Sequence, residues 1–211
     1  MHTTIARAAL ALILSLLAGP ALLAQGQSVK ISGLVELSGT GATSGTNFND
    51  GVKLAVKEIN AGGGILGRKI DYTSNDTQSQ PQIAKALAVQ AIDDGAYVVM
   101  GPVFSGSILV SMAETRRAEI PNFTGGEAAA ITQQGNPYIF RTSFTQASAM
   151  PKVARYFKDT VKAKTVAMIW VANDFGKGGR DVFTKTSRPP LPKSLFTQMT
   201  ATVFAFTVLL M

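Results

Sequence analysis

The chain has 211 residues and a mass of 22.2 kDa, and its 20 Lys and Arg against 13 Asp and Glu give a formal net charge of +7 and an isoelectric point near 9.8. A hydrophobic share of 46% excludes global disorder and suits one or two packed domains. The absence of cysteine excludes disulfides, thiolate metal sites and cysteine nucleophiles, and the single histidine, His2, disfavours histidine-dependent hydrolases.

Residues 1–26 have the pattern of a secretory signal peptide. Arg7 precedes an apolar run from 8 to 18, which is too short to span a bilayer, and small residues near Ala24 suit a cleavage site. A short membrane anchor is the alternative interpretation. A cleaved signal predicts a periplasmic location for the mature protein.

The rest of the chain alternates between segments of strand type and segments of helical periodicity. In chain order we predict a strand at 29–37, a loop at 38–46, a helix over 48–59, a strand at 69–75, a helix from 79 to about 95, a strand at 97–100, a helix at 105–117, strands at 120–123 and 138–142, a helix at 150–161, a strand at 165–171 and a helix from 176 to about 185. This order predicts an α/β fold with a doubly wound, mostly parallel sheet. Ligands of such sheets bind beyond the carboxyl ends of the strands.

Three of the predicted helices carry further signals. Phe48, Val52, Ala55, Val56 and Ile59 share one face of the first helix. Ser79 and Gln82 have the spacing of a capping box around Pro81 in the second. Val153, Tyr156 and Phe157 form the apolar stripe of the helix at 150–161.

Several loops at strand ends contain candidate ligand-binding groups. The N–H groups that open the helix at Ser105, with the hydroxyls of Ser105 and Ser107, suit a carboxylate or phosphate, and ordinary capping by Ser105 is the alternative. In the loop Gly125-Gly126-Glu127 the glycines admit a ligand close to the backbone and Glu127 can accept hydrogen bonds from an ammonium group, or the loop is a turn with a solvated acid. Phe175 is either an aromatic lid or a core residue.

The loop at 38–46 invites a dinucleotide interpretation that its spacing does not support. Its glycines follow G-x-G-x-x-x-G, and the nearest acid at the end of the second strand, Asp76, comes about 35 residues later where the fingerprint needs about 20. A nucleotide-dependent enzyme is therefore the disfavoured alternative.

Several short motifs occur together in one order: 29–31, 37–39, 47–51, 58–63, 66–68, 75–76, Gly101 before the serine loop, 120–121, 140–142 and 174–176. With this order and spacing the chain resembles, over about 29–181, the branched-chain amino-acid (leucine/isoleucine/valine) binding proteins that serve ABC importers. The resemblance implies a type I periplasmic-binding fold, in which two α/β lobes joined by three crossings hold a solute between them.

The resemblance also assigns roles to individual positions. The family's carboxylate-binding serine loop falls on Ser105, Gly106 and Ser107, and its next loop, which supplies carbonyls and a hydroxyl, falls on Gly125, Gly126 and Glu127. Glu127 stands where a small hydroxyl residue is usual, Ser44 stands where an aromatic residue is usual, and Phe175 matches an aromatic residue of the second lobe. The implied partners are a small solute and the ABC permease membrane subunits, with no enzyme activity, cofactor, metal or nucleic acid.

The resemblance divides the chain into residues 27–142, an incomplete N-terminal ligand-binding lobe, residues 143–185, the start of a second lobe, and residues 186–211, an unmatched apolar tail. One interpretation of this tail is that the chain is a truncated or frameshifted fragment that binds no solute. The alternatives are that the tail is a membrane anchor for a ligand-sensing domain, or that it is a variant edge of the domain. The positive surplus lies almost wholly within 151–211. We therefore interpret the basic isoelectric point as a sign of incompleteness rather than of nucleic-acid binding.

Overall fold

The computed structural model describes residues 28–164, 166–187, 195–199 and 208–210. The predicted signal peptide at 1–26 and most of the predicted tail at 186–211 lie outside the described residues. Within the described ranges, no helix is long and apolar enough to cross a lipid bilayer.

The larger part of the structure is built on a parallel five-stranded sheet with the order β2-β1-β3-β4-β5. Its strands are β1 (Val29–Val35), β2 (Ile70–Asp76), β3 (Val98–Met100), β4 (Asn122–Thr124) and β5 (Ile139–Arg141). The chain adds β2 on one side of β1 and then β3, β4 and β5 on the other. This order confirms the predicted doubly wound α/β fold.

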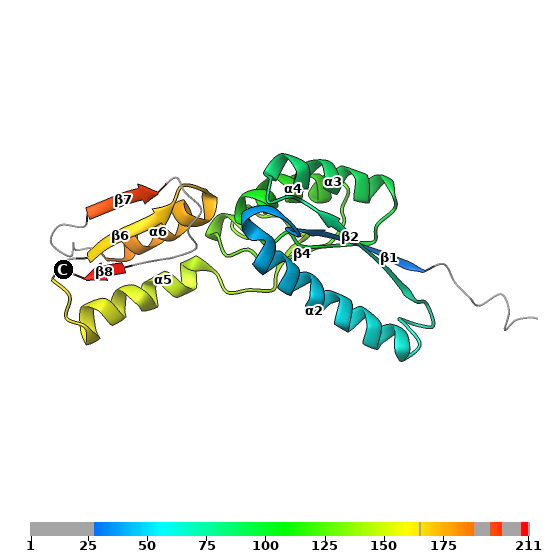
Figure 1. Cartoon of the computed structure of the whole chain (residues 1–211), viewed down its shortest axis with the longest axis horizontal. Coiled ribbons are helices and arrows are strands. Elements are labelled where there is room, and N and C mark those ends of the chain that lie inside the picture. The colour runs from blue at the N-terminus through cyan, green and yellow to red at the C-terminus, as the bar shows by residue number, and fades with distance from the viewer. Residues whose placement is uncertain (1–27, 165, 188–194, 200–207, 211) are drawn as a thin grey trace, which may run out of the picture.

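Helices cover both faces of this sheet (Figure 1). Helix α2 (Ala42–Ala61) lies on one face, and α3 (Pro81–Asp93) and α4 (Ser105–Arg117) lie on the other. Two apolar clusters hold α3 and α4 in place; one contains Leu34, Ala88, Ala91, Ala96 and Val99, and the other Ile108, Met112, Ala128, Ile131 and Ile139. The bounds of α4 are those that the sequence predicts.

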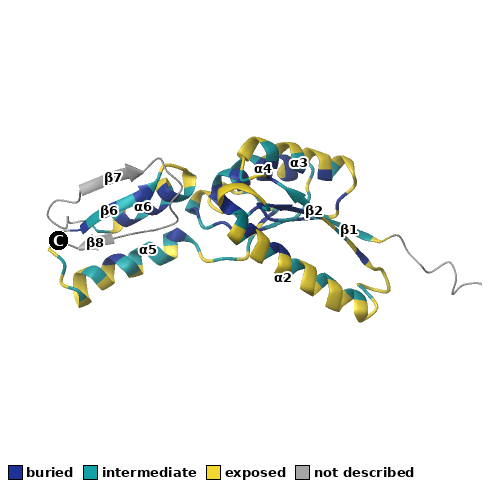
Figure 2. Cartoon of the chain, viewed as in Figure 1, coloured by how far each residue is buried: buried dark blue, intermediate teal, exposed yellow. Residues whose placement is uncertain are grey.

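Helix α2 packs on the sheet through small and polar residues rather than through its apolar stripe. Its buried residues are Gly45 and Asn49, and Asn49 Oδ1 accepts hydrogen bonds from the hydroxyls of Tyr72 (2.8 Å) and Ser74 (2.9 Å). The predicted apolar face is only partly covered, since Ile59 is 41% exposed and most of the helix surface is open (Figure 2).

A second, smaller sheet follows in the chain, with the order β7-β6-β8. Strand β6 (Val166–Val171) pairs in parallel with β7 (Leu195–Met199) and antiparallel with β8 (Val208–Leu210), so described parts of the predicted tail extend this sheet. Helices α5 (Gln146–Arg155) and α6 (Asp174–Thr186) pack with this sheet. Their shared core contains Ala154, Val166, Met168, Trp170 and Phe183.

The predicted loop at 38–46 is wrong, because a 3-10 turn, η1 (Gly39–Gly41), leads directly into α2 at Ala42. The carboxylate of Asp76 fixes the chain just before this turn. It accepts hydrogen bonds from Leu37 N (2.9 Å), Ser38 N (3.1 Å) and Ser38 Oγ (2.6 Å). The start of the helix can then approach β1 closely, since a methyl group on Gly45 would lie 2.1 Å from the Glu36 carbonyl oxygen.

The predicted capping box of α3 is also wrong. Gln80 is the N-cap residue and makes no side-chain cap, although Pro81 does occupy the first turn. The Ser79 hydroxyl instead donates to the Ser38 carbonyl (2.7 Å) and accepts from Gly41 N (2.9 Å). The Ser79 hydroxyl therefore makes two hydrogen bonds to residues far away in the sequence instead of the predicted local bond within its own helix.

Three predictions about helix ends and apolar residues also differ from the structure. Tyr97 precedes β3 and is 71% exposed, so it is not part of a buried strand. Helix α5 begins earlier than predicted and continues as a π-helical turn, η3 (Tyr156–Thr160), which leaves Tyr156 exposed. Helix α6 begins at Asp174 rather than Gly176, because Asn173 Oδ1 accepts from Gly176 N (2.9 Å) and caps it.

Candidate functional site

The loops that the sequence singles out lie together at one edge of the five-stranded sheet. Because β1, β3 and β4 run parallel, Glu36, Gly101 and Gly125 follow their strands at the same, carboxyl edge. This is the edge at which doubly wound sheets bind ligands.

The loop between β3 and α4 passes close to β1. Gly101 has a φ of +89°, and a methyl group on it would lie 2.2 Å from the Leu34 carbonyl oxygen, so this position suits glycine alone. Phe104 is the N-cap residue of α4, and Ser105, Gly106 and Ser107 form its first turn. The N–H groups of a first turn have no acceptor within the helix, so this turn directs donors and the positive end of the helix dipole toward the sheet edge.

The two serine hydroxyls of this turn are directed into the protein. Ser105 is 3% exposed, and its Oγ accepts a hydrogen bond from Ala128 N over 3.3 Å. Ser107 is 1% exposed, and its Oγ has no hydrogen-bond partner within the described residues. Side-chain capping by Ser105, the alternative interpretation of this motif, is wrong, because Phe104 occupies the cap position. The donors that the turn offers to a ligand are therefore its backbone N–H groups.

Arg141, at the end of β5, fastens the neighbouring loop after β4. Its guanidinium donates to the carbonyl oxygens of Gly126 and of Ala128 (2.9 Å), and Gly126 O also accepts from Ser143 Oγ (3.1 Å). Gly125 N donates to the Pro102 carbonyl (3.2 Å), which joins this loop to the one after β3. The two candidate loops therefore form one hydrogen-bonded unit.

Glu127 contributes a half-buried carboxyl group to this unit. Burial raises the pKa of Glu127, and the positive charge of Arg141 acts in the opposite direction. Burial likewise lowers the pKa of Arg141, with Glu127 opposing it. Because the guanidinium is occupied by carbonyl oxygens, the Glu127 carboxylate can accept hydrogen bonds from an ammonium or hydroxyl group of a ligand.

A second carboxyl group at this edge, that of Glu36, is fully buried at 0% exposure. Its Oε2 accepts from Val103 N (3.0 Å) and its Oε1 from Phe104 N (3.1 Å). Burial raises the pKa of Glu36, although these two N–H groups act to lower it. The carboxylate therefore binds the loop immediately before the first turn of α4.

The start of α6 faces the start of α4. A methyl group on Gly106 would lie 3.2 Å from Asp174 Oδ2, and the half-buried Phe175 follows Asp174. Gln146 ties this segment to the sheet edge, because its Nε2 donates to the Phe175 carbonyl (2.8 Å) and its backbone N–H donates to the Glu127 carbonyl (2.9 Å). Residues of the second sheet's helices thus border the site.

Ser44 lies half-buried in the first turn of α2, beside the same loops. A methyl group on Gly41 would lie 2.7 Å from the Phe104 ring, and one on Gly125 would lie 3.5 Å from the Phe48 ring. The first turns of α2 therefore form a third side of the site.

The structure thus brings the predicted residues Ser105, Gly106, Ser107, Gly125, Gly126 and Glu127 together, with Phe175 and Ser44 on neighbouring elements. Sequence reasoning missed Glu36, Arg141 and Gln146 as parts of this site. The sequence pattern that could have identified Glu36 as a site residue is an acidic residue at the end of an otherwise apolar strand. Among the described residues, no group of three or more acidic side chains is placed to hold a metal ion.

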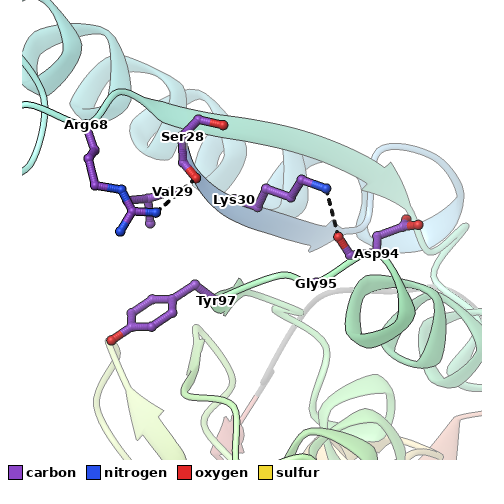
Figure 3. A pocket seen from close by; sticks show the side chains of 7 residues that line it. All are labelled: Ser28, Val29, Lys30, Arg68, Asp94, Gly95 and Tyr97. Atoms are coloured by element: carbon purple, nitrogen blue, oxygen red, sulfur yellow. Dashed lines mark hydrogen bonds between the residues drawn. The ribbon is translucent and has the colours of Figure 1, made fainter. Parts of the chain in front are cut away.

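A separate pocket opens at the opposite, amino edge of the sheet (Figure 3). Lys30 Nζ donates to the Asp94 carbonyl (2.9 Å), Arg68 donates to the Ser28 carbonyl (3.4 Å), and Tyr97 lies at the rim. Lys30 and Arg68 thus each use one donor on a backbone carbonyl of the chain itself.

Comparison with known proteins gives the same family from sequence and from structure. The sequence model of the periplasmic binding protein family matches residues 28–188. The leucine-specific-binding protein of Salmonella typhimurium is 31% identical over 74% of this chain and 42% of its own length. The Leu/Ile/Val-binding protein of Escherichia coli is 29% identical over 74% of this chain and 43% of its own length.

Solved structures show the same fold. The branched-chain amino acid transporter substrate binding protein LivJ from Streptococcus pneumoniae, in complex with isoleucine, matches with a TM-score of 0.74 and 26% identity over 84% of this chain and 51% of that one. A solute binding protein from Rhodopseudomonas palustris, in complex with 4-hydroxybenzoate, matches with a TM-score of 0.71 and 26% identity over 82% of this chain and 47% of that one. The chain spans less than half the length of the curated relatives that it matches here.

Proposed function

Because this chain belongs to the family of periplasmic binding proteins, we propose that it captures a small solute in the periplasm for an ABC importer. The proposed solute is an amino acid of the branched-chain type or a related small carboxylate. The proposed partners are the membrane subunits of the permease. The family consists of solute-binding proteins, so the proposed activity is binding and release without a chemical step.

The observation that carries this proposal is the joining of the two candidate loops at the carboxyl edge of the sheet. The backbone N–H groups of Ser105, Gly106 and Ser107 suit the carboxylate of a solute, since a helix start combines free donors with a favourable dipole. The carboxylate of Glu127 suits an ammonium group at the neighbouring loop. An α-amino acid carries both groups on one carbon atom.

The remaining proposed contacts are those of the side chain of the solute. Phe175 supplies an aromatic surface from the start of α6, and its backbone is held by Gln146. Ser44 is small, which leaves room for the solute beside α2. The proposed closure is a hinge movement of α6 and its sheet relative to the five-stranded sheet, as in other two-lobed binding proteins.

The test is isothermal titration of the purified full chain with L-leucine, L-isoleucine, L-valine, benzoate and 4-hydroxybenzoate. We expect saturable, one-to-one heat with at least one of these solutes. Glu127→Gln should weaken the binding of amino acids more than that of the two benzoates, which lack an ammonium group. The exposed Glu58→Gln is the matched control and should bind as the wild type does. The absence of heat with every solute would overturn the proposal.

A further inference from the structure

The loop that leads into α4 already binds a carboxylate, that of Glu36 of the protein itself. Glu36 places one carboxylate oxygen 3.0 Å from Val103 N and the other 3.1 Å from Phe104 N. Hydrogen bonds from two consecutive backbone N–H groups to one carboxylate are charge-assisted and therefore strong. Here the anion comes from the end of β1, 67 residues before Val103.

The surroundings of Glu36 leave this carboxylate few other partners. The residue is completely buried, and a methyl group on Gly41 would lie 3.0 Å from its Cβ, so the start of α2 covers it. Asp76, at the end of β2, is the ionised group whose charge acts on it, and this charge is repulsive. The segments 37–49 and 101–113, which include the starts of α2 and α4, carry no charged side chain. The two N–H groups are therefore the main stabilising contacts of the ionised form.

We propose that Glu36 is a positioning and specificity-determining residue of the site, a resident carboxylate that shapes the solute-binding loop and disfavours solutes with an uncompensated negative charge. Its specificity aspect rests on the proposed function. The N–H groups of Val103 and Phe104 are occupied, so a solute carboxylate is limited to the next donors, at Ser105 to Ser107. A buried negative charge next to these donors favours a zwitterion over a bare anion, because the ammonium group offsets the repulsion.

The positioning aspect is tested without any solute, by nuclear magnetic resonance of the full chain. We expect the amide protons of Val103 and Phe104 to shift together as the pH is lowered, because protonation of Glu36 weakens both hydrogen bonds. Their common midpoint should lie above the ordinary value for glutamate, about 4.3. Glu36→Gln should abolish this titration, and Glu58→Gln should leave it unchanged. The proposal is overturned if the two amides do not titrate, or if they titrate equally in Glu36→Gln.

The specificity aspect is tested with two probes that differ only in the ammonium group, L-leucine and 4-methylpentanoate. The wild type should bind L-leucine more tightly than 4-methylpentanoate. Glu36→Gln should reduce the ratio of the two dissociation constants about tenfold, because the variant lacks the buried charge. Glu36→Asp retains the charge and should retain the preference, which keeps the test decisive if Glu36→Gln folds poorly. An unchanged preference in a folded Glu36→Gln would overturn this aspect. If the wild type binds neither probe, the proposed function fails, and the amide titration alone decides the role of Glu36.

Discussion

The side-chain amide of Gln146 donates a hydrogen bond to the carbonyl oxygen of Phe175 over 2.8 Å, although 29 residues separate the two in the chain. Gln146 is 1% exposed, and its backbone N–H donates to the Glu127 carbonyl. Gln146, the first residue of α5, therefore joins the loop after β4 to the start of α6. This connection determines where Phe175 lies relative to the candidate site.

Gln146→Ala should destabilise the protein, because it removes the hydrogen bond to the Phe175 carbonyl and leaves unfilled the space of a side chain that is 1% exposed. The expected loss is about 0.5–1.5 kcal/mol in the free energy of unfolding, the net contribution of a typical intramolecular hydrogen bond. Urea denaturation measures this loss. Gln133→Ala removes an exposed glutamine and is the matched control. Equal unfolding midpoints for the two variants would contradict the prediction.

Two glycine-to-alanine substitutions should have opposite effects on stability. A methyl group on Gly126 would lie 2.2 Å from Ile108 Cδ1, so Gly126→Ala should cost about 1–3 kcal/mol through overpacking. Gly51 lies in the exposed interior of α2 with nothing within 4 Å, so Gly51→Ala should stabilise by about 0.5–1 kcal/mol.

Addition of Ile108→Val to Gly126→Ala tests the cause, because valine lacks the Cδ1 atom. The double variant should lose less free energy of unfolding than the sum of the losses in the two single variants. Additive losses in thermal or urea unfolding would show that overpacking against Ile108 is not the reason.

The two buried serines in the first turn of α4 should also respond in opposite directions when each is replaced by alanine. Ser107→Ala removes a hydroxyl that has no partner within the described residues, so it should stabilise by about 1 kcal/mol. Ser105→Ala leaves Ala128 N without its acceptor and should destabilise by about 1 kcal/mol. Unfolding midpoints of the two variants, which share one helical turn, provide the comparison. A less stable Ser107→Ala would indicate a hydrogen bond that this structure lacks.

The stabilisation by Asp76 should depend on pH. Burial acts to raise the pKa of Asp76, but the Ser38 hydroxyl and the N–H groups of Gln78, Leu37 and Ser38 outweigh it and lower the pKa below its ordinary value. The folded state therefore binds this proton less strongly than the unfolded state does. The stabilisation is full above the ordinary pKa of aspartate and is lost as the pH falls through the lowered pKa.

Asp76→Asn should therefore cost about 1–3 kcal/mol at neutral pH, and the difference from the wild type should shrink in acid. The measurement is the free energy of unfolding at a series of pH values. Asp71→Asn, an exposed substitution on the same strand, is the control. A difference that does not change with pH would contradict this account.

Much of the architecture follows from local sequence. The alternation of strand and helix patterns predicts the doubly wound sheet, and the segment 105–117 matches α4 at both ends. Since parallel strands end at one edge, the alternation also places Ser105 and Glu127 on the same side of the sheet. Patterns of this kind depend on the period of apolar residues, which each segment carries by itself.

The partners of the polar side chains were decided by the tertiary structure. Ser79 binds Ser38 instead of capping its own helix, and Ser105 binds Ala128 instead of capping α4. The Glu36 carboxylate accepts from Val103 N and Phe104 N, immediately before the donors that the sequence assigns to a solute. Local pattern cannot predict these choices, because a buried polar group must find a partner and the nearest one in space is far away in the chain. The sequence thus determines where the candidate site lies, and the packing of distant segments decides which of its polar groups are already hydrogen-bonded within the protein.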